Sequence, residues 1–357
     1  MVEYNKWHIE LGSAVVLHVG GASAGGRGGA RVLMTKTASK VPLAKSLAQI
    51  CEQGVYTCPS CHAPNEVGHL APLSTGSCSK CGQKFFMPRR INDFYLFEEI
   101  GSGGMGSVYK AVSERYPGRT LAVKLLSRQK GESALNVQAL LNEARISSLF
   151  RDSQYLAACL DHGFDDGEYY TVMNFVEGER LDLLIERLGR VPEPELVTLV
   201  RHLLAAEQHI WRCGYLYRDM KPENIIVNPE GYAVLFDFGL CLPRRDALNN
   251  AGEYITGSPY YLPPERLLGQ PEDARSEIYS LGMVMYYALT GRTYYNADEI
   301  NALAKRHIGG LRIISAAKME GISKPLADIL TAMIQQEPDK RPASFLQLKQ
   351  ELDKLTY

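Results

Sequence analysis

The sequence lacks several features that would place it in a specialised class. Its 357 residues contain no apolar run of the roughly 18 residues that a membrane span requires. The net charge is −1, from 39 Lys and Arg against 40 Asp and Glu, which argues against a protein devoted to nucleic acid or membrane surfaces. Eight cysteines are too few for a disulfide scaffold at this length. We therefore predict no nucleic-acid partner and no membrane span, and we expect a cytoplasmic protein with reduced thiols.

Charge and glycine are unevenly distributed along the chain. Residues 1–93 hold 10 basic and 5 acidic side chains, an excess of +5, so the remainder carries −6. Six of the eleven residues from Gly20 to Ala30 are glycine, a composition that cannot bury a core. We expect a poorly ordered leader at 1–57, a compact cysteine unit at 58–82, a linker at 83–93 and a globular domain at 94–354.

The cysteine unit has the spacing of a metal site. Cys58 and Cys61 are followed, after sixteen residues, by Cys78 and Cys81, which fits the C-x₂-C-x₁₅₋₂₀-C-x₂-C zinc pattern. Two thiolates three residues apart reach one side of a metal if the backbone turns between them, and two such turns close a Cys₄ shell. We predict a structural Zn²⁺ in a unit that resembles a zinc ribbon. Unbound thiols or a redox pair are the alternative, and a regulatory partner could dock on this unit.

The globular domain begins with strand-like alternation and then becomes mostly helical, which predicts an α+β fold with a cleft between two lobes. The expected strands are 95–100, 107–112, 120–126, 160–164, 169–175, 225–227 and 232–236, and the expected helices are 132–150 and 196–211.

A glycine-rich segment lies near the start of this domain. Gly101, Gly103 and Gly106 precede Val108 in a GxGxxGxV pattern. Such a pattern opens either a Rossmann helix or a strand–loop–strand flap. The flap is favoured because the residues that follow alternate as in a strand. Glycines let backbone N–H groups approach phosphates without a side-chain clash.

Lys124 lies sixteen residues after Val108, within an apolar strand. A lone buried ammonium group is costly, so Lys124 needs anionic partners. The phosphates of ATP and one carboxylate would satisfy it. Glu143, on the helix that follows, is the natural carboxylate, although a solvated helix face would also account for Glu143 alone.

Four further motifs make the resemblance to a known family. Residues 217–224, Tyr-Arg-Asp-Met-Lys-Pro-Glu-Asn, resemble the HRDxKxxN catalytic loop of protein kinases. Asp-Phe-Gly follows at 237–239, Pro-Pro-Glu at 263–265 resembles the APE motif, and Arg341 resembles the late arginine that pairs with that glutamate. Over 94–354 the chain is similar to serine/threonine protein kinases, especially the eukaryotic-like ones of bacteria. The resemblance implies a bilobal kinase fold with a β-rich N-lobe and a helical C-lobe.

The resemblance also assigns roles to single residues. It implies that Asp219 orients or accepts the proton of the substrate hydroxyl, that Lys221 neutralises the γ-phosphate, and that Asn224 and Asp237 bind Mg²⁺. Lys124, held by Glu143, would bind the α- and β-phosphates. The implied activity is ATP-dependent phosphorylation of Ser and Thr in proteins, with autophosphorylation. The nucleotide-binding residues would be Ile100, Gly101, Gly103, Gly106, Val108, Ala122, Lys124, Met173, Asn174, Val176 and Ile226.

Arg218 beside the catalytic acid suggests control by phosphorylation of the activation loop, through an arginine–phosphate pair. Thr256 is the favoured phosphorylation site. Ser258 matches the position that contacts the catalytic loop, so we expect it to hydrogen-bond with Asp219 and Lys221.

Three residues depart from the family pattern. Tyr217 stands where histidine is usual, and Glu277 stands where an aspartate normally anchors the catalytic loop. Ser147 replaces a large apolar side chain that usually packs against Phe238. We expect these changes to loosen the active arrangement without removing a chemical group. A pseudokinase that binds ATP as a signalling scaffold is therefore the alternative function. A small-molecule phosphotransferase is disfavoured by Lys221, Glu265 and Arg341.

Overall fold

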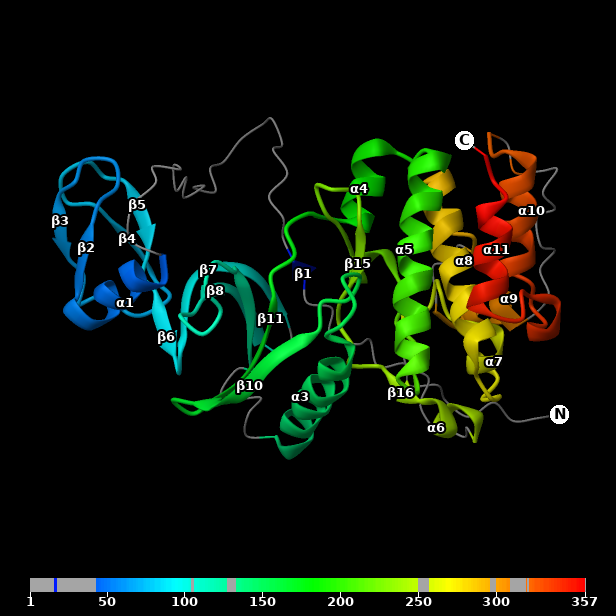
Figure 1. Ribbon diagram of the computed structural model, residues 1–357, viewed down its shortest axis with the longest axis horizontal. Coiled ribbons are helices and arrows are strands. Elements are labelled where there is room, and N and C mark those ends of the chain that lie inside the picture. The colour runs from blue at the N-terminus through cyan, green and yellow to red at the C-terminus, as the bar shows by residue number, and fades with distance from the viewer. Residues whose placement is uncertain are drawn as a thin grey trace. The chain divides into compact units, whose positions relative to one another are not determined.

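The computed structural model describes residues 16–17, 43–103, 106–126, 133–249, 257–295, 300–308, 319 and 321–356. These residues fall into two compact units (Figure 1). Of the described residues, the strand-rich unit contains 16–17, those from 43 to 141, and 159–175, and the helical unit contains 142–158 and those from 176 to 356. Apart from 16–17 and 43–57, the expected leader lies outside the described residues.

The strand-rich unit is built on one antiparallel sheet whose strand order is β1-β7-β8-β9-β11-β10, with β6 paired to the other end of β7. All five strands predicted for this part are confirmed. The strands are β1 (Val16–Leu17), β6 (Arg89–Ile91), β7 (Phe94–Gly103), β8 (Gly106–Val112), β9 (Leu121–Leu126), β10 (Cys159–Asp165) and β11 (Glu168–Asn174).

The two faces of this sheet have different roles, because side chains alternate along each strand. Val108, Ala122 and Lys124 share one face, since Val108 pairs with Lys124 across β8 and β9. The opposite face, which we call the back face, carries a buried cluster that fixes the register of the strands. This cluster contains Ile91, Phe94, Leu96, Tyr109, Ala111, Leu121, Val123, Leu125, Tyr170 and Val172.

The cysteine unit consists of two small hairpins preceded by a helix. Its core is formed by Val67, Phe85 and Met87, and the ring of Tyr56 stacks on Phe85 at 4.2 Å between centroids. Helix α1 lies in the expected leader, and β5 and β6 lie in the expected linker. The elements are α1 (Leu43–Gln53), β2 (Val55–Thr57), β3 (Pro64–Glu66), β4 (Thr75–Ser77) and β5 (Lys84–Phe86).

The cysteine unit packs directly on the sheet. Leu73 and Phe86 lie against the back-face cluster. On α1, Leu47 is buried with Tyr95 and Val112 of β7 and β8. The hairpin β6–β7 then joins the two parts through a two-residue turn. The unit is therefore continuous with the sheet. Leu73 and Phe86 cover the back face, whereas helix α1 packs on the Lys124 face, because Val112 alternates with the back-face residue Ala111.

The helical unit is organised around α5, which packs against α8, α11 and the hairpin β14–β15 (Figure 1). Leu196, Leu199 and Leu203 of α5 are buried, as their helical spacing predicts. Helix α3 begins in the strand-rich unit and ends in the helical unit. Within the part of the chain that the structure describes, no helix is both long and apolar enough to cross a membrane.

The helices are α3 (Ala134–Ser147), α4 (Leu181–Leu188), α5 (Glu193–Arg212), α6 (Arg244–Leu248), α7 (Pro264–Leu267), α8 (Ala274–Thr290), α9 (Ile300–Ile308), α10 (Lys324–Met333) and α11 (Phe345–Asp353), with 3₁₀ turns at η1 (Ser148–Phe150), η2 (Pro222–Asn224) and η4 (Pro338–Lys340). Short strands β12 (Glu179–Arg180), β13 (Tyr215–Leu216), β14 (Ile225–Val227), β15 (Ala233–Leu235) and β16 (Leu242–Pro243) connect them. The predicted hairpin at 225–236 and the two predicted helices are confirmed, with small shifts at their ends.

Candidate active site and metal centre

The loop between β13 and β14 carries the predicted catalytic acid. Asp219 is buried, and its Oδ2 accepts hydrogen bonds from Lys221 Nζ at 2.8 Å and from Asn224 Nδ2 at 2.7 Å. Asn224 Nδ2 also donates to the main-chain oxygen of Asp219 at 3.1 Å. The second carboxylate oxygen, Oδ1, is buried and accepts no hydrogen bond from the described residues.

The two carboxylate oxygens of Asp219 therefore have different roles. Burial raises the pKa of Asp219, and the positive charge of Lys221 opposes that rise. Oδ2 fixes the orientation of the carboxylate, which leaves Oδ1 as an oriented acceptor. We expected Ser258 to hydrogen-bond with Asp219. Among the described residues, however, Asp219 accepts hydrogen bonds from the side chains of Lys221 and Asn224 and not from Ser258.

The hairpin β14–β15 brings the two predicted Mg²⁺ ligands to one end. The N–H of Phe236 donates to the main-chain oxygen of Asn224 at 3.1 Å, so Asp237 lies one residue beyond that pair. Asp237 has a φ of +62°, a conformation that costs a non-glycine residue energy and that recurs at functional sites. Because Asn224 Nδ2 is committed to Asp219, its Oδ1 faces elsewhere. One amide oxygen and one carboxylate fit the hard oxygen ligands that Mg²⁺ prefers.

Glu265 and Arg341 form a buried bidentate ion pair, as predicted. Nη1 and Nη2 of Arg341 lie 2.7 and 2.9 Å from the two carboxylate oxygens of Glu265. Ser276 donates to the same carboxylate at 2.6 Å. The remaining N–H groups of Arg341 reach main-chain oxygens, including Gln335 at 2.6 Å. Such a fully satisfied pair fixes α7 to the start of α8 and to the segment before α11.

In the strand-rich unit, the glycine-rich segment forms the hairpin between β7 and β8, with Gly103 opposite Gly106. The predicted flap is thereby confirmed, because a strand follows it rather than a helix. A Cβ on Gly106 would lie 1.8 Å from the main-chain oxygen of Leu125, so only glycine fits there. Lys124 is buried in β9, paired with Val108 on one side and Thr171 on the other.

The other predicted nucleotide-binding residues divide between the two units. Ile100, Gly101, Ala122, Met173 and Asn174 lie on strands of the strand-rich unit, where Met173 pairs with Ala122. Val176, Ile226 and Glu143, the last on α3, belong to the helical unit.

Comparison with known proteins identifies the family of the domain that carries these residues. Residues 94–352 match the family described as "Protein kinase domain". The chain belongs to the protein kinase domain family. It is similar to the serine/threonine-protein kinases PknH of Mycobacterium bovis, at 30% identity over 273 residues, and PknL of Mycobacterium tuberculosis, at 29% over 266. These matches cover 76% and 74% of this chain, but only 44% of PknH and 66% of PknL. The chain thus spans less than two thirds of the length of these curated relatives.

Tyr217, the first departure from the usual kinase residues, contacts two residues at the Asp-Phe-Gly motif. The hydroxyl of Tyr217 donates to the main-chain oxygen of Phe236 at 2.6 Å. The ring of Tyr217 packs edge-on against the ring of Phe238, with 5.9 Å between their centroids. The ring of Phe150 also packs against Phe238, at 5.3 Å between centroids. Phe238 is fully packed although Ser147 is small. Two aromatic rings thus pack against Phe238, and the expected loosening at Ser147 stays a prediction.

Glu277, the third departure, still anchors the kinase catalytic loop. Both of its carboxylate oxygens accept from the N–H of Arg218, at 3.1 and 3.2 Å. Glu277 is hydrogen-bonded in turn to Glu207 of α5. Burial raises the pKa of Glu277 to about 7 and the pKa of Glu207 well above its ordinary value. Burial and the neighbouring carboxyl group therefore favour the protonated form of this pair, in which the O–H of one carboxyl group can donate to the other.

Two arginines complete a buried network under this loop. Arg266 donates from Nη1 to the main-chain oxygen of Arg218 at 2.6 Å and from Nε to Glu272 at 2.7 Å. Nη2 of Arg218 lies 2.9 Å from the other oxygen of Glu272. Two arginines thus lie among three carboxyl groups, those of Glu207, Glu272 and Glu277. We call these five residues the loop-anchoring network.

The sequence motifs did not reveal Glu207, Arg266 or Glu272. For Glu207 a signal existed, because it falls on the apolar stripe of α5, three and four residues after Leu204 and Leu203. An acid on a buried stripe needs a partner. For Arg266 and Glu272 no local pattern points inward, since their burial depends on contacts between distant segments.

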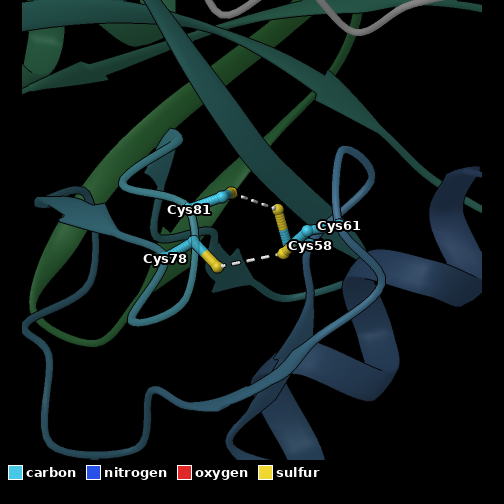
Figure 2. Close-up of side chains that lie close together, drawn as sticks. All are labelled: Cys58, Cys61, Cys78 and Cys81. Carbon is cyan, nitrogen blue, oxygen red and sulfur yellow. Dashed lines mark hydrogen bonds between the residues drawn. The ribbon is translucent and has the colours of Figure 1, made fainter.

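The four cysteines form a compact cluster (Figure 2). Their sulfur atoms all lie within 4.8 Å of one another, with 3.5 Å between Cys58 and Cys81 and 3.6 Å between Cys61 and Cys78. A tetrahedral ion with Zn–S bonds of about 2.3 Å needs sulfur–sulfur edges of about 3.8 Å. The cluster therefore fits Zn²⁺ with all four positions supplied by the protein.

The two cysteine turns have the same backbone pattern. The N–H of His62 donates to the oxygen of Cys58 at 2.8 Å, and the N–H of Gly82 donates to that of Cys78 at 2.9 Å. Both residues have a positive φ, +56° for His62 and +73° for Gly82. The glycine adopts this conformation at little cost, whereas the histidine is strained by about 1 kcal/mol.

Asn65 ties the two turns together, and the sequence did not single it out. Its Nδ2 donates to the sulfur of Cys78 at 3.5 Å and to the oxygen of Ala63 at 3.0 Å, while its Oδ1 accepts from the N–H of Ser79 at 2.8 Å. Asn65 is buried. Hydrogen bonds of this kind orient metal ligands and temper the charge on sulfur.

The thiols of the cluster cannot all ionise unaided. Backbone N–H groups of Cys81 and Lys80 lower the pKa of Cys78 to about 6. At Cys81 the N–H of Gln83 favours the thiolate, yet the neighbouring sulfur of Cys61, together with burial, raises the pKa to about 12. A divalent cation would remove this conflict, because it binds the thiolate form of every ligand.

Proposed function

We propose that the chain is a protein kinase that transfers the γ-phosphoryl group of ATP to Ser and Thr hydroxyls of protein substrates. The observation that carries the proposal is the oriented, buried carboxylate of Asp219, with Oδ2 held by Lys221 and Asn224 and Oδ1 left to accept. A group that takes a proton in the transition state must be held in this way. The restriction to Ser and Thr rests on the printed names of the similar kinases and on Lys221, which resembles the serine/threonine signature.

The proposed reaction balances around these side chains. The hydroxyl oxygen of the substrate attacks the γ-phosphorus, and the bond from that phosphorus to the β–γ bridging oxygen breaks, so a phosphoester and ADP form. The hydroxyl proton passes to Oδ1 of Asp219. Lys221 lies 2.8 Å from Asp219 Oδ2, where its charge can offset the negative charge of the γ-phosphate. Mg²⁺, when held by Asn224 and Asp237, supplies further charge neutralisation.

The strand-rich unit supplies nucleotide contacts in this proposal. The backbone of the β7–β8 hairpin would cover the phosphates, and Lys124 would bind them, with Glu143 as its carboxylate partner. Ile100, Val108 and Ala122 would form the walls of the adenine pocket together with Met173 and Ile226, while the backbone from Asn174 to Val176 would hydrogen-bond to the base.

We also infer that Cys58, Cys61, Cys78 and Cys81 hold a structural Zn²⁺. The sulfur cluster and the hydrogen bond from Asn65 support this assignment. Because thiolates persist where disulfides are reduced, the cytoplasm remains the compartment that we propose. Docking of a regulatory partner on this unit stays a proposal.

The decisive experiment uses the purified full-length chain, labelled ATP and Mg²⁺, beside Asp219→Asn. The variant keeps the shape of the side chain but cannot accept a proton. We expect label in a generic protein substrate, and in the kinase itself by autophosphorylation, with a fall of about 10²–10⁴-fold in the variant. Equal incorporation by the two proteins would overturn the enzyme proposal. If neither protein transfers label but both bind nucleotide, the pseudokinase alternative stands.

A further inference from the structure

The side chain of Arg218 meets a carboxylate inside the protein. Nη2 of Arg218 lies 2.9 Å from Oε1 of Glu272, and the other oxygen of that carboxylate accepts from Nε of Arg266 at 2.7 Å. The side chain of Glu272 is 1% exposed. Although burial works against ionisation, the two arginines lower the pKa of Glu272, so a full negative charge bridges two guanidinium groups.

Glu272 also lies where three segments meet. Its N–H donates to the main-chain oxygen of Ala247 in α6 at 3.0 Å, and Ala247 is completely buried. Helix α6 follows the Asp-Phe-Gly motif and so belongs to the activation segment. The next residue, Asp273, caps α8 with a hydrogen bond to the N–H of Arg275. The position of Glu272 is therefore fixed by backbone contacts as well as by charge.

The charges around Arg218 leave little room for a second anion. Glu277 accepts from the N–H of Arg218, and Glu272 takes the guanidinium group. Arg266 supplies the second positive charge and is itself buried. A phosphate group on the activation loop would carry a charge of about −1.5 to −2, and it would have to displace Glu272 or lie beside it. Either outcome is unfavourable, because like charges repel strongly in a buried site.

We propose that Glu272 is a positioning residue that replaces the activation-loop phosphate. By holding Arg218, it keeps the loop that carries Asp219 in its working conformation without phosphorylation. This inference rests on the proposed kinase function. It replaces our expectation that Arg218 awaits a phosphate on Thr256, a residue that lies outside the described part of the chain.

The first test asks whether the rate depends on phosphate. The full-length chain is freed of phosphate with a phosphatase, the absence of phosphate is verified by mass spectrometry, and the initial rate of phosphorylation of a protein substrate is measured. We expect the phosphate-free kinase and Thr256→Ala to keep their rate within about 2-fold of the untreated protein. A fall of about 10-fold or more in either would overturn the inference, since loss of an ordering phosphate has effects of that order or larger.

The second test removes the charge of Glu272 while conserving its shape. We expect Glu272→Gln to lower kcat about 10-fold or more with KM for ATP within about 2-fold, and Glu272→Asp to recover part of kcat. A purely structural role would change the melting temperature without this split between kcat and KM. Wild-type rates for Glu272→Gln would overturn the inference. Absence of activity in the wild type relative to Asp219→Asn would instead overturn the proposed function, so the two failures are distinct.

Discussion

The metal centre and the catalytic loop solve the same electrostatic problem in different ways. Each gathers acidic groups in a small volume, four thiols in one case and three carboxyl groups in the other. Under the catalytic loop the compensation is internal, because Arg218 and Arg266 lie among the carboxyl groups. In the cysteine cluster the compensation that we propose is external, a Zn²⁺ ion taken up from solution.

The catalytic loop and the cysteine cluster should therefore differ in how their stability depends on solution conditions. A site that carries its own counter-charges is complete as soon as the chain folds. A thiol cluster is complete only when metal is bound, so its folding varies with metal concentration and with the redox state of the thiols. The back face of the sheet is packed against the cysteine unit through Leu73 and Phe86. Loss of metal should consequently destabilise the sheet that carries Lys124.

The largest effect is expected from Cys78→Ser. A serine hydroxyl cannot replace a thiolate, so metal content measured by elemental analysis should fall from one zinc per chain to none, with a loss of up to about 10 kcal/mol of binding free energy. The melting transition of the strand-rich unit should shift down. Cys213→Ser is the matched control, because Cys213 is half-buried and far from the cluster in sequence. One equivalent of zinc retained by Cys78→Ser would contradict the Cys₄ assignment.

The internal compensation is tested by Arg266→Met. Removing this guanidinium group leaves Glu272 and Glu277 facing one arginine, and we expect the free energy of unfolding to fall by about 3–5 kcal/mol in chemical denaturation. Arg187→Met provides the comparison, since Arg187 pairs with Glu179 at the surface. There the loss should stay below about 1 kcal/mol. Similar losses of unfolding free energy for the two variants would show that the buried network stabilises the protein no more than a surface ion pair does.

The protonated pair is tested by pH. The pKa of Glu277 is about 7 in the folded protein, above its ordinary value, and burial also raises the pKa of Glu207 well above its ordinary value. Between the ordinary pKa and pH 7 the folded state holds more protons than the unfolded state, so stability falls as pH rises through that range. Glu207→Gln keeps a donor to Glu277 but cannot ionise. Its stability relative to wild type should therefore improve from pH 5 to pH 8. A difference between the two proteins that does not change with pH would refute the shared proton.

The smallest effect is expected from Tyr217→Phe. The ring that packs against Phe238 remains, but the main-chain oxygen of Phe236 loses its donor and stays buried. We expect a loss of about 1–2 kcal/mol of stability, measured by denaturation, and a smaller change in kcat. Tyr217→His restores a donor and should recover part of this loss. If Tyr217→Phe is as stable as wild type, the hydroxyl does not hold the segment before Asp237.

Residues that act through a local motif were predictable, and residues that act through distant contacts were not. Asp219, Lys221 and Asn224 lie within six residues of one another, so their hydrogen bonds follow from the loop itself. The pair of Glu265 and Arg341 was predictable only through the family resemblance, because 76 residues separate them. The compensation of Tyr217 by Phe236 and Phe238 could not be foreseen, since a substitution in a motif does not reveal which atoms it will meet.

The strand order was likewise predictable only in part. Alternation located β7, β8 and β9, and the turn at residues 165–167 located the hairpin of β10 and β11. The packing of the cysteine unit on the sheet left no periodic signal, because Leu73 and Phe86 lie in short segments outside the sheet. Their exposure depends on where the unit docks, which the local sequence does not specify.

The hairpin β6–β7 has a practical consequence for anyone who wishes to excise the catalytic domain. The family match begins at residue 94, three residues after β6 ends. A fragment cut there would lose Ile91, which is completely buried, and would leave the first half of β7 as an unpaired edge beside Phe94 and Leu96. Exposed apolar edges recruit other strands, so such a fragment should self-associate. The smallest well-behaved piece of this kinase should begin near residue 43.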